Sequence, residues 1–133
     1  MSEEKKIKVV LLEPGNLART AEIGTSIEDL QNAVDGLIEP FYPFEEQVCI
    51  VCNDEGKING MLPNRSVKNK DGVMVDFIFG PAFICDCRGE SFDSLSDEQI
   101  ARYTKMFRYP EHLARLNGKL IGIPFNPQRE HER

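Results

Sequence analysis

The sequence predicts an α+β fold, a mainly antiparallel sheet built from hairpins with two helices packed on it. Short apolar runs rich in β-branched and aromatic residues alternate with Gly, Pro and Asn turns, which is typical of hairpin-connected strands. Two stretches with apolar residues at helical spacing, 26–35 and 97–108, each follow a helix-capping signal. With 133 residues, 41% of them hydrophobic, we expect one domain over 1–125 and a polar tail over 126–133.

The first part of the chain predicts a hairpin followed by a helix. Residues 5–13 form the first expected strand, Pro14-Gly15-Asn16 supplies a turn, and 17–23 returns as the second arm. Thr25-Ser26-Ile27-Glu28 predicts a capping box, in which the threonine hydroxyl accepts a helix amide and the glutamate reaches back. Gly36 is the expected cap at the other end of this helix.

The middle of the chain predicts an edge strand and a second hairpin. Residues 37–44 are aromatic but include two prolines, so they suit an edge strand or an extended crossing segment. Residues 48–52 predict a strand, the turn 53–56 ends in glycine, and 57–61 is the expected return strand. Leu62-Pro63 should end that strand, and the polar segment 66–72 is expected to be a loop.

The second half carries the strongest local signals. Gly80-Pro81 divides the most hydrophobic stretch, 73–87, into two arms, and the second arm, 82–87, is expected to be a central strand. Ser96 and Gln99 predict a capping box that opens the second helix. Asn117-Gly118 predicts a type I′ turn between two strands.

Charge and hydropathy exclude several classes of partner. A net charge of -6 and a pI near 5.0 argue against a protein that binds nucleic acid by neutralising phosphates. No run approaches the roughly 20 apolar residues of a membrane helix. The opening MSEEKKIKVV lacks the apolar region of a secretory signal. We therefore expect a cytoplasmic protein with no membrane partner.

The cysteines are the sharpest candidates for metal chemistry. Cys49, Cys52, Cys85 and Cys87 form a CxxC and a CxC pair, and zinc sites use such pairs. A strand over 48–52 would instead point Cys49 and Cys52 to opposite faces, and the flanking apolar residues favour packed thiols. We expect no metal and no cofactor.

Catalytic signatures are sparse in the sequence. A thiol nucleophile would need His112 to meet Cys52 or Cys85 in space, because the other histidine lies in the tail. The GxSxG, Walker A, HExxH and GxGxxG motifs do not occur. We therefore expect a protein that is not an enzyme.

Polar side chains gather at the tip and exit of the predicted 48–61 hairpin. Their amide, carboxylate, ammonium and guanidinium groups suit a small polar ligand or the backbone of a partner. The alternative is that these groups only make turn hydrogen bonds, stay solvated or pair with a nearby acid. The candidate site residues are Asn53, Asp54, Glu55, Lys57, Asn64 and Arg65.

Three segments carry a family resemblance: CNDEGKINGMLPNR, DFIFGPAFIC and LSDEQIARYTKMF. With them, roughly residues 7–125 resemble the small bacterial and phage proteins of the domain of unknown function 3846 family. The resemblance implies an α+β fold and a setting on phages or mobile genetic elements, near antirestriction and transfer genes. It implies no catalytic residues.

Taken together, we expect a small accessory protein of a phage or mobile element that acts by binding. The leading hypothesis is a protein-interaction module that docks its partner through the polar hairpin end and the aromatic segment 41–44. A second is a small-ligand protein that binds or sequesters a nucleotide-like molecule through Lys57, Asn64 and Arg65. A third is an acidic antirestriction protein that mimics DNA, although the acids are interspersed with basic residues.

Overall fold

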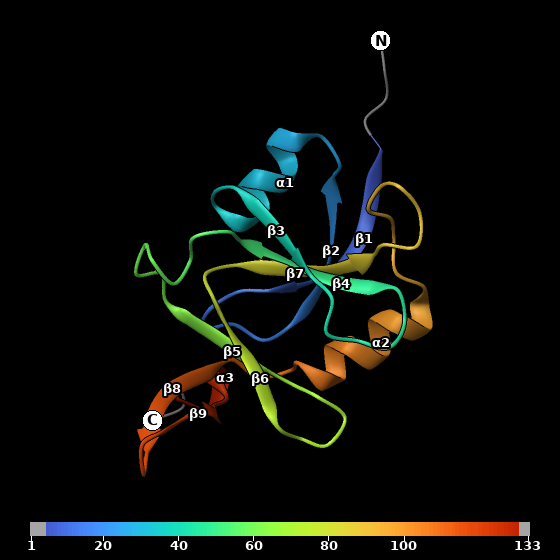
Figure 1. Cartoon of the computed structure of the whole chain (residues 1–133). Coiled ribbons are helices and arrows are strands. Elements are labelled where there is room, and N and C mark those ends of the chain that lie inside the picture. Colours follow the sequence, from blue (N-terminus) through green and yellow to red (C-terminus); the bar gives the residue numbers. More distant parts are fainter. Residues whose placement is uncertain (1–4, 131–133) are drawn as a thin grey trace.

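The computed structural model describes residues 5–130, which fold as an α+β protein with antiparallel strand pairs (Figure 1). The elements in chain order are β1 (Lys6–Leu12), β2 (Arg19–Gly24), α1 (Ile27–Val34), β3 (Ile38–Phe41), β4 (Val48–Asn53), β5 (Pro63–Lys68), β6 (Met74–Phe79), β7 (Ala82–Asp86), α2 (Asp97–Met106), β8 (Glu111–Leu116), β9 (Lys119–Pro124) and α3 (Pro127–Glu130). No helix among these residues is long and apolar enough to cross a membrane. Residues 1–4 and 131–133 lie outside the described range. The first four residues of MSEEKKIKVV, the segment in which we expect no secretory signal, are among them.

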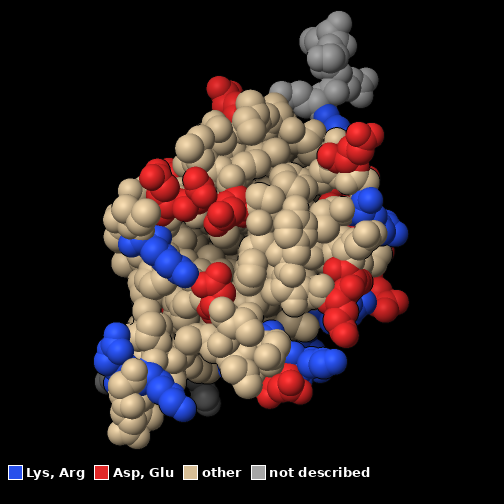
Figure 2. All heavy atoms as spheres, viewed as in Figure 1, with Lys and Arg blue, Asp and Glu red and all other residues tan. Residues whose placement is uncertain are grey.

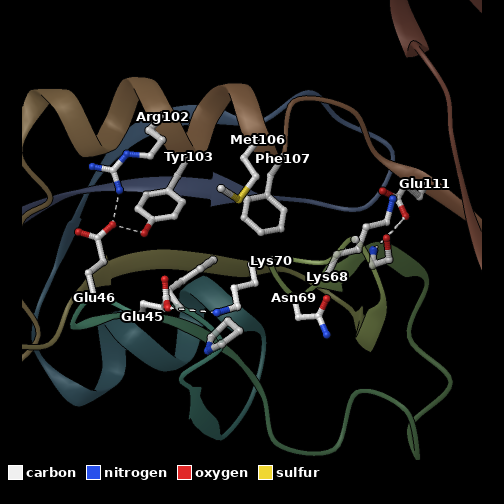
Figure 3. A pocket seen from close by; sticks show the side chains of 14 residues that line it. Glu45, Glu46, Lys68, Asn69, Lys70, Arg102, Tyr103, Met106, Phe107 and Glu111 are labelled. Carbon is white, nitrogen blue, oxygen red and sulfur yellow. Dashed lines mark hydrogen bonds and ion pairs between the residues drawn. The ribbon is translucent and has the colours of Figure 1, made fainter.

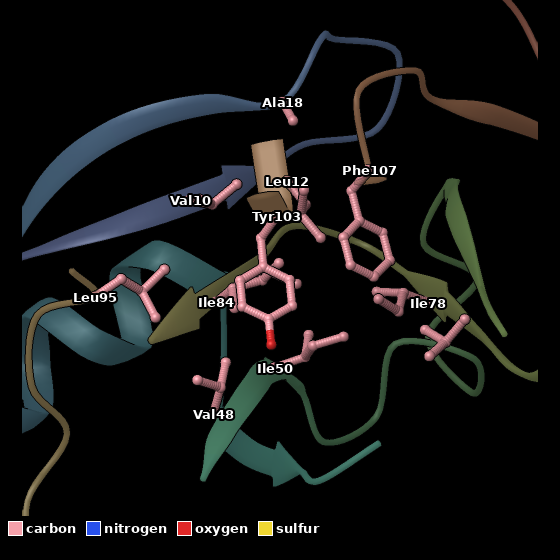
Figure 4. Packing of buried hydrophobic residues seen from close by; sticks show 12 residues of the cluster. Val10, Leu12, Ala18, Val48, Ile50, Ile78, Ile84, Leu95, Tyr103 and Phe107 are labelled. Atoms are coloured by element: carbon pink, nitrogen blue, oxygen red, sulfur yellow. The ribbon is translucent and has the colours of Figure 1, made fainter. Parts of the chain in front are cut away.

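A five-stranded sheet in the order β2-β1-β7-β4-β3 forms the centre of the molecule. Leu30 and Val34 of α1 pack on one face. Tyr103 of α2 packs on the other (Figure 4). All five residues of β7 are buried, because helices cover both faces of the sheet. The prediction that 82–87 forms a central strand is confirmed.

Local capping chemistry determines where the helices begin and end. The predicted capping box at Ser96 and Gln99 is confirmed, since each side chain bonds the other residue's backbone N–H. The first helix differs from expectation, because its cap is Ser26, whose hydroxyl accepts the Asp29 amide at 3.1 Å. The C-terminal cap of this helix is Asp35, one residue earlier than the predicted Gly36, and Asp35 takes the left-handed conformation with φ 61°.

Two-stranded ribbons, β5–β6 and β8–β9, stand apart from the sheet. The predicted hairpin between 48–52 and 57–61 is wrong: β4 pairs with β3 and β7, so neither of its edges is left for a return strand. Residues 54–60 form turns, and β5 instead begins at Pro63 and extends through the first part of the predicted 66–72 loop. The Asn117-Gly118 turn of β8–β9 is confirmed, with φ 51° and 81°.

Candidate functional site

The structure divides the six predicted site residues into two groups. Asn53, Asp54, Glu55 and Lys57 line a hollow of about 380 Å³ bounded by β3, β6 and the turns after β4. Asn64 and Arg65 instead lie in β5 with no exposed surface, and they do not line this hollow. The turn and the Leu-Pro-Asn-Arg segment therefore do not meet at one surface.

Arg65 is bonded inside the fold through its whole guanidinium group. Nε donates to the Phe107 carbonyl at 2.6 Å, and one terminal nitrogen donates to Asn64 Oδ1 and to the Glu13 carbonyl. The other donates to the carbonyls of Asn16 and Arg108 at 2.6 and 3.4 Å. Burial lowers the pKa of Arg65 to about 10. This pKa is still well above 7, so the guanidinium group is charged at neutral pH. Its donors fasten β5 to the chain around β1 and α2, so they are engaged within the fold.

The two asparagines also bond backbone groups. Asn64 Nδ2 donates to the carbonyls of Leu12 and Gly80, at 3.0 and 2.8 Å. Asn53 Nδ2 donates to the carbonyl of Val34, the last residue of α1, and to that of its cap, Asp35. Its Oδ1 accepts the amide of Glu55. Asn53 therefore combines a turn hydrogen bond with a cap on α1.

That approach to α1 explains a glycine in the sequence. A Cβ on Gly36 would lie 2.5 Å from Asn53 Nδ2, so a side chain there would displace the amide.

The 380 Å³ hollow is acidic, since Glu39, Asp54, Glu55 and Asp76 line it. Its lysine, Lys57, already donates to Asp76 at 2.8 Å, which leaves an environment unfavourable to an anionic ligand.

A larger hollow of about 700 Å³ lies between α2, the segment after β3, β5 and the β5–β6 loop (Figure 3). Its floor is apolar because α2 turns Tyr103 and Phe107 toward the sheet, where each is at least 93% buried. The Phe44 ring packs on both, with centroids 4.7 and 6.2 Å away. Met106 also lines the hollow but remains 57% exposed, so it offers apolar surface to a bound molecule.

One wall of this hollow is closed by the carboxylate of Glu46. One oxygen accepts from Arg102 and from the Tyr103 hydroxyl (Figure 3). The other accepts from Gln99 at 3.0 Å. The Tyr103 hydrogen bond lowers the pKa of Glu46, and burial together with the same bond raises the pKa of Tyr103. Gln99 also belongs to the capping box, so this network ties the β3–β4 segment to the start of α2.

The opposite wall carries two lysines. Lys70 Nζ lies 4.0 Å from Glu45, and both side chains are more than three-quarters exposed, so this ion pair is weak. Among the described residues, Lys68 Nζ has no carboxylate within ion-pair distance. Asn69 shapes the loop between them, because its Oδ1 accepts the amides of Asp71 and Val73. Both ammonium groups are therefore available to an anion.

Of the predicted docking surface, only the end of the aromatic segment 41–44 lies here, because Pro43 and Phe44 line the hollow. The sequence pattern predicted 66–72 as a polar loop and the face of the second helix as packing surface, whereas the structure puts them on two sides of one hollow. The sequence carries two separate signals: Tyr103, Met106 and Phe107, spaced three and four apart, make a wide apolar face, and two lysines stand two residues apart at 68 and 70. Only the fold brings them together.

The cysteines are all free thiols that lie on two faces of the sheet. Cys49 faces Cys85, with their sulfurs 3.8 Å apart, in the α1 layer, whereas Cys52 packs with the α2 layer. The prediction that a strand directs Cys49 and Cys52 to opposite faces is confirmed. Within residues 5–130, no group of three or more His, Cys, Asp or Glu is arranged to hold a metal ion.

The thiol–histidine alternative has little geometric support. The His112 ring stacks on Phe125 with centroids 4.0 Å apart, in the β8–β9 ribbon, whereas Cys52 and Cys85 belong to the sheet. Burial raises the pKa of Cys52 to about 11, and the contact with Cys49 together with burial raises that of Cys85. Neither thiol is therefore activated as a thiolate near neutral pH.

Comparison with known proteins gives one match. The family model described as Domain of unknown function (DUF3846) matches residues 7–108, which include the sheet, both helices that cover it and nearly all of the 700 Å³ hollow. No curated protein and no solved structure matches the chain.

Proposed function

The chain belongs to the DUF3846 family, and we propose that it is a non-catalytic module that binds a small organic anion in the hollow beside α2. The observation that carries the proposal is the combination of an apolar floor with two lysines on one side of a 700 Å³ hollow. Ligand sites typically have volumes of about 300–1,000 Å³ and combine apolar walls with a few polar groups.

The lining defines the chemistry of the ligand. A flat or aliphatic body would lie against Phe44 and Met106, while a carboxylate or phosphate would meet Lys68 and Lys70. A nucleotide-like molecule has both parts, and it also suits the small-ligand hypothesis drawn from the sequence. The acidic hollow beside Lys57 suits such an anion less well, because four carboxylates and one paired lysine line it. Three carboxylates also line the larger hollow, but Lys68, Lys70 and Arg102 balance them.

Binding without turnover is favoured by the protonation of the polar wall. General acid–base catalysis works best when the pKa of the group lies near the working pH. The pKa of Glu46 is lowered and that of Tyr103 is raised, so both are held away from neutrality. Glu46 also accepts three hydrogen bonds, which favours a structural role for its carboxylate.

The biological setting is the accessory role on a phage or mobile element that the family resemblance implies. A cytoplasmic protein of that kind would act by sequestering its ligand. DNA mimicry by an acidic surface has less support, because acidic groups are interspersed with basic ones on the face in Figure 2. The protein-interaction hypothesis is best supported at another surface, between the two ribbons.

Calorimetric titration with a panel of nucleotides and organic phosphates tests the proposed ligand class. We expect at least one compound to bind, and the double substitution Lys68→Ala and Lys70→Ala to weaken its binding by about tenfold or more. Lys57→Ala is the matched control, because it removes a lysine from the other hollow, and it should change affinity less than about twofold.

The outcomes of this titration are distinct. Absence of binding across the panel, or equal losses in the control and the double variant, would contradict the proposed site. Chromatography of the ligand after prolonged incubation checks the second half of the proposal, since a new product peak would show that the protein is catalytic.

A further inference from the structure

A separate groove of about 720 Å³ runs between the β5–β6 and β8–β9 ribbons. Its walls are the second half of β5, the start of β6, the β8–β9 turn and most of β9. It adjoins the 700 Å³ hollow beside α2, here called the ligand hollow, and shares Ser66, Lys68 and Gly72 with it. Most of its other lining residues differ. Most of one wall belongs to β8–β9, which lies beyond the residues matched by the family model.

The charged residues of this groove are all basic. Lys68, Arg115 and Lys119 line it, and no acidic side chain does, in a chain whose net charge is -6. Figure 2 shows basic side chains gathered at the end of the molecule where Figure 1 places the β8–β9 ribbon. The groove therefore attracts a partner of opposite charge.

Between these charges the groove is apolar. Val73 and Leu120 line it with 58% and 45% of their surface exposed, alongside Met74 and Ile121. Exposed aliphatic side chains that line one groove are typical of an interaction surface. The partner that covers them must supply apolar side chains as well as negative charge.

The backbone of the ribbons also has unused pairing capacity. Each ribbon has two strands, so each strand has one hydrogen-bonded neighbour. No backbone hydrogen bond joins the two ribbons within residues 5–130, and Ser66 reaches the β8 side through the Glu111 carboxylate instead. In β5 this capacity is limited, because four of its six residues are buried and the Ser66 amide donates to Glu111. Strand β9 lines the groove and has no buried residue, so its unpaired edge is suited to pairing with an extended segment of another chain.

We propose that this groove docks an extended, acidic protein segment whose carboxylates alternate with aliphatic side chains. In an extended segment successive side chains point to opposite sides, so the aliphatic set meets Val73 and Leu120 while the acidic set meets the basic rim. Nucleic acid fits less well, because the groove has no aromatic side chain for base stacking and has only three cations. The proposal does not depend on the ligand hollow.

Fluorescence anisotropy with a labelled peptide of alternating Glu and Val residues tests the proposal on the full chain. We expect saturable binding at physiological salt, weakened about tenfold or more by the pair Arg115→Glu and Lys119→Glu. These two residues do not line the ligand hollow, so nucleotide binding should be unchanged in this variant. The milder pair Arg115→Gln and Lys119→Gln provides a second test if the reversed charges disturb the ribbon.

The matched control is Lys6→Glu with Lys105→Glu, which changes net charge equally at exposed positions outside the groove. Affinity within about twofold of the unaltered chain supports the proposal, because long-range charge alone then has a small effect. An equal loss in this control overturns it, as does tighter binding of a single-stranded or duplex oligonucleotide than of the peptide. Absence of peptide binding by the unaltered chain also overturns it.

Discussion

The five-stranded sheet and the β8–β9 ribbon are held in place by different physical means. In the sheet, every residue of β7 and five of the six in β4 are buried, so apolar packing on both faces dominates. In the β8–β9 ribbon no strand residue is buried. Such a ribbon removes little apolar surface from water and needs other attachments.

Those attachments are polar side chains that bond distant parts of the chain. Arg65 connects β5 to carbonyls after β1 and after α2, and Asn64 connects it to Leu12 and Gly80. Ser66 donates to Glu111 at 2.6 Å and thereby joins the two ribbons. Directional bonds position β8–β9 with little burial of its own residues, whereas β5–β6 also buries Val67, Phe77 and Ile78. The sparse packing around β8–β9 leaves the apolar groove open to solvent.

The largest effect on this difference is expected from Arg65→Met. Methionine is about as long but donates no hydrogen bond, so the buried carbonyl of Phe107 and the part-buried carbonyls of Glu13 and Asn16 lose their donor. We expect the free energy of unfolding to fall by about 3–5 kcal/mol in urea titrations. Hydrogen exchange should show a greater loss of protection in β5 and β6 than in β7.

Arg19→Met is the control for that substitution, because Arg19 is a 57% exposed arginine that pairs with Glu13 at the surface. Its stability should remain within about 0.5 kcal/mol of the unaltered chain. A loss of less than about 1 kcal/mol for Arg65→Met would contradict the view that polar bonds fasten the ribbons.

A smaller effect is expected from Ile84→Val in the centre of the sheet. The substitution removes one methylene from a fully buried side chain in β7 and should cost about 0.5–1.5 kcal/mol by urea titration. Val75→Ala in β6, at a side chain that is 52% exposed, should cost less than about 0.5 kcal/mol. Equal costs at the two positions would remove the contrast between sheet and ribbon.

The smallest effect is expected from Glu46→Gln, which tests a polar contact on the sheet half. The pKa of Glu46 is lowered in the fold, so its carboxylate stabilises the protein at pH values above the ordinary pKa of 4.5. This contribution is lost as the pH falls through the lowered pKa. The variant should be less stable at pH 7 by less than about 1 kcal/mol, since the side chain is one-third exposed.

Urea midpoints between pH 7 and pH 3 measure this dependence. The difference between the two proteins should shrink as the pH falls below about 4.5. A difference that stays constant over that range would assign the effect to packing instead of charge.

Sequence patterns predicted the elements better than their partners. The Ser96–Gln99 capping box and the Asn117-Gly118 turn depend on residues next to one another, and both are present as expected. The hairpin predicted after 48–52 failed because β3 and β7, from distant parts of the chain, occupy both edges of that strand. Competition for strand edges is not visible in a local pattern.

The candidate site shows the same limit. Four predicted residues at the β4 turn do line a hollow, because one short segment carries them. Arg65 and Asn64 were grouped with that turn by closeness in sequence, but a buried strand takes them into the interior. The larger hollow was missed because its walls, α2 and β5, are separated by two strands of the chain.

Local sequence determines the α+β class, the start of α2, the Asn117-Gly118 turn and the opposite-facing cysteines of β4. Hydrogen bonds and side-chain directions within a few residues fix these features. Long-range packing fixes which strands pair, and it provides Arg65 with acceptors as far away in the chain as Asn16 and Phe107. A buried guanidinium group needs hydrogen-bond acceptors, and Arg65 finds them in backbone carbonyls from distant parts of the chain. Those carbonyls come together only when the whole chain folds.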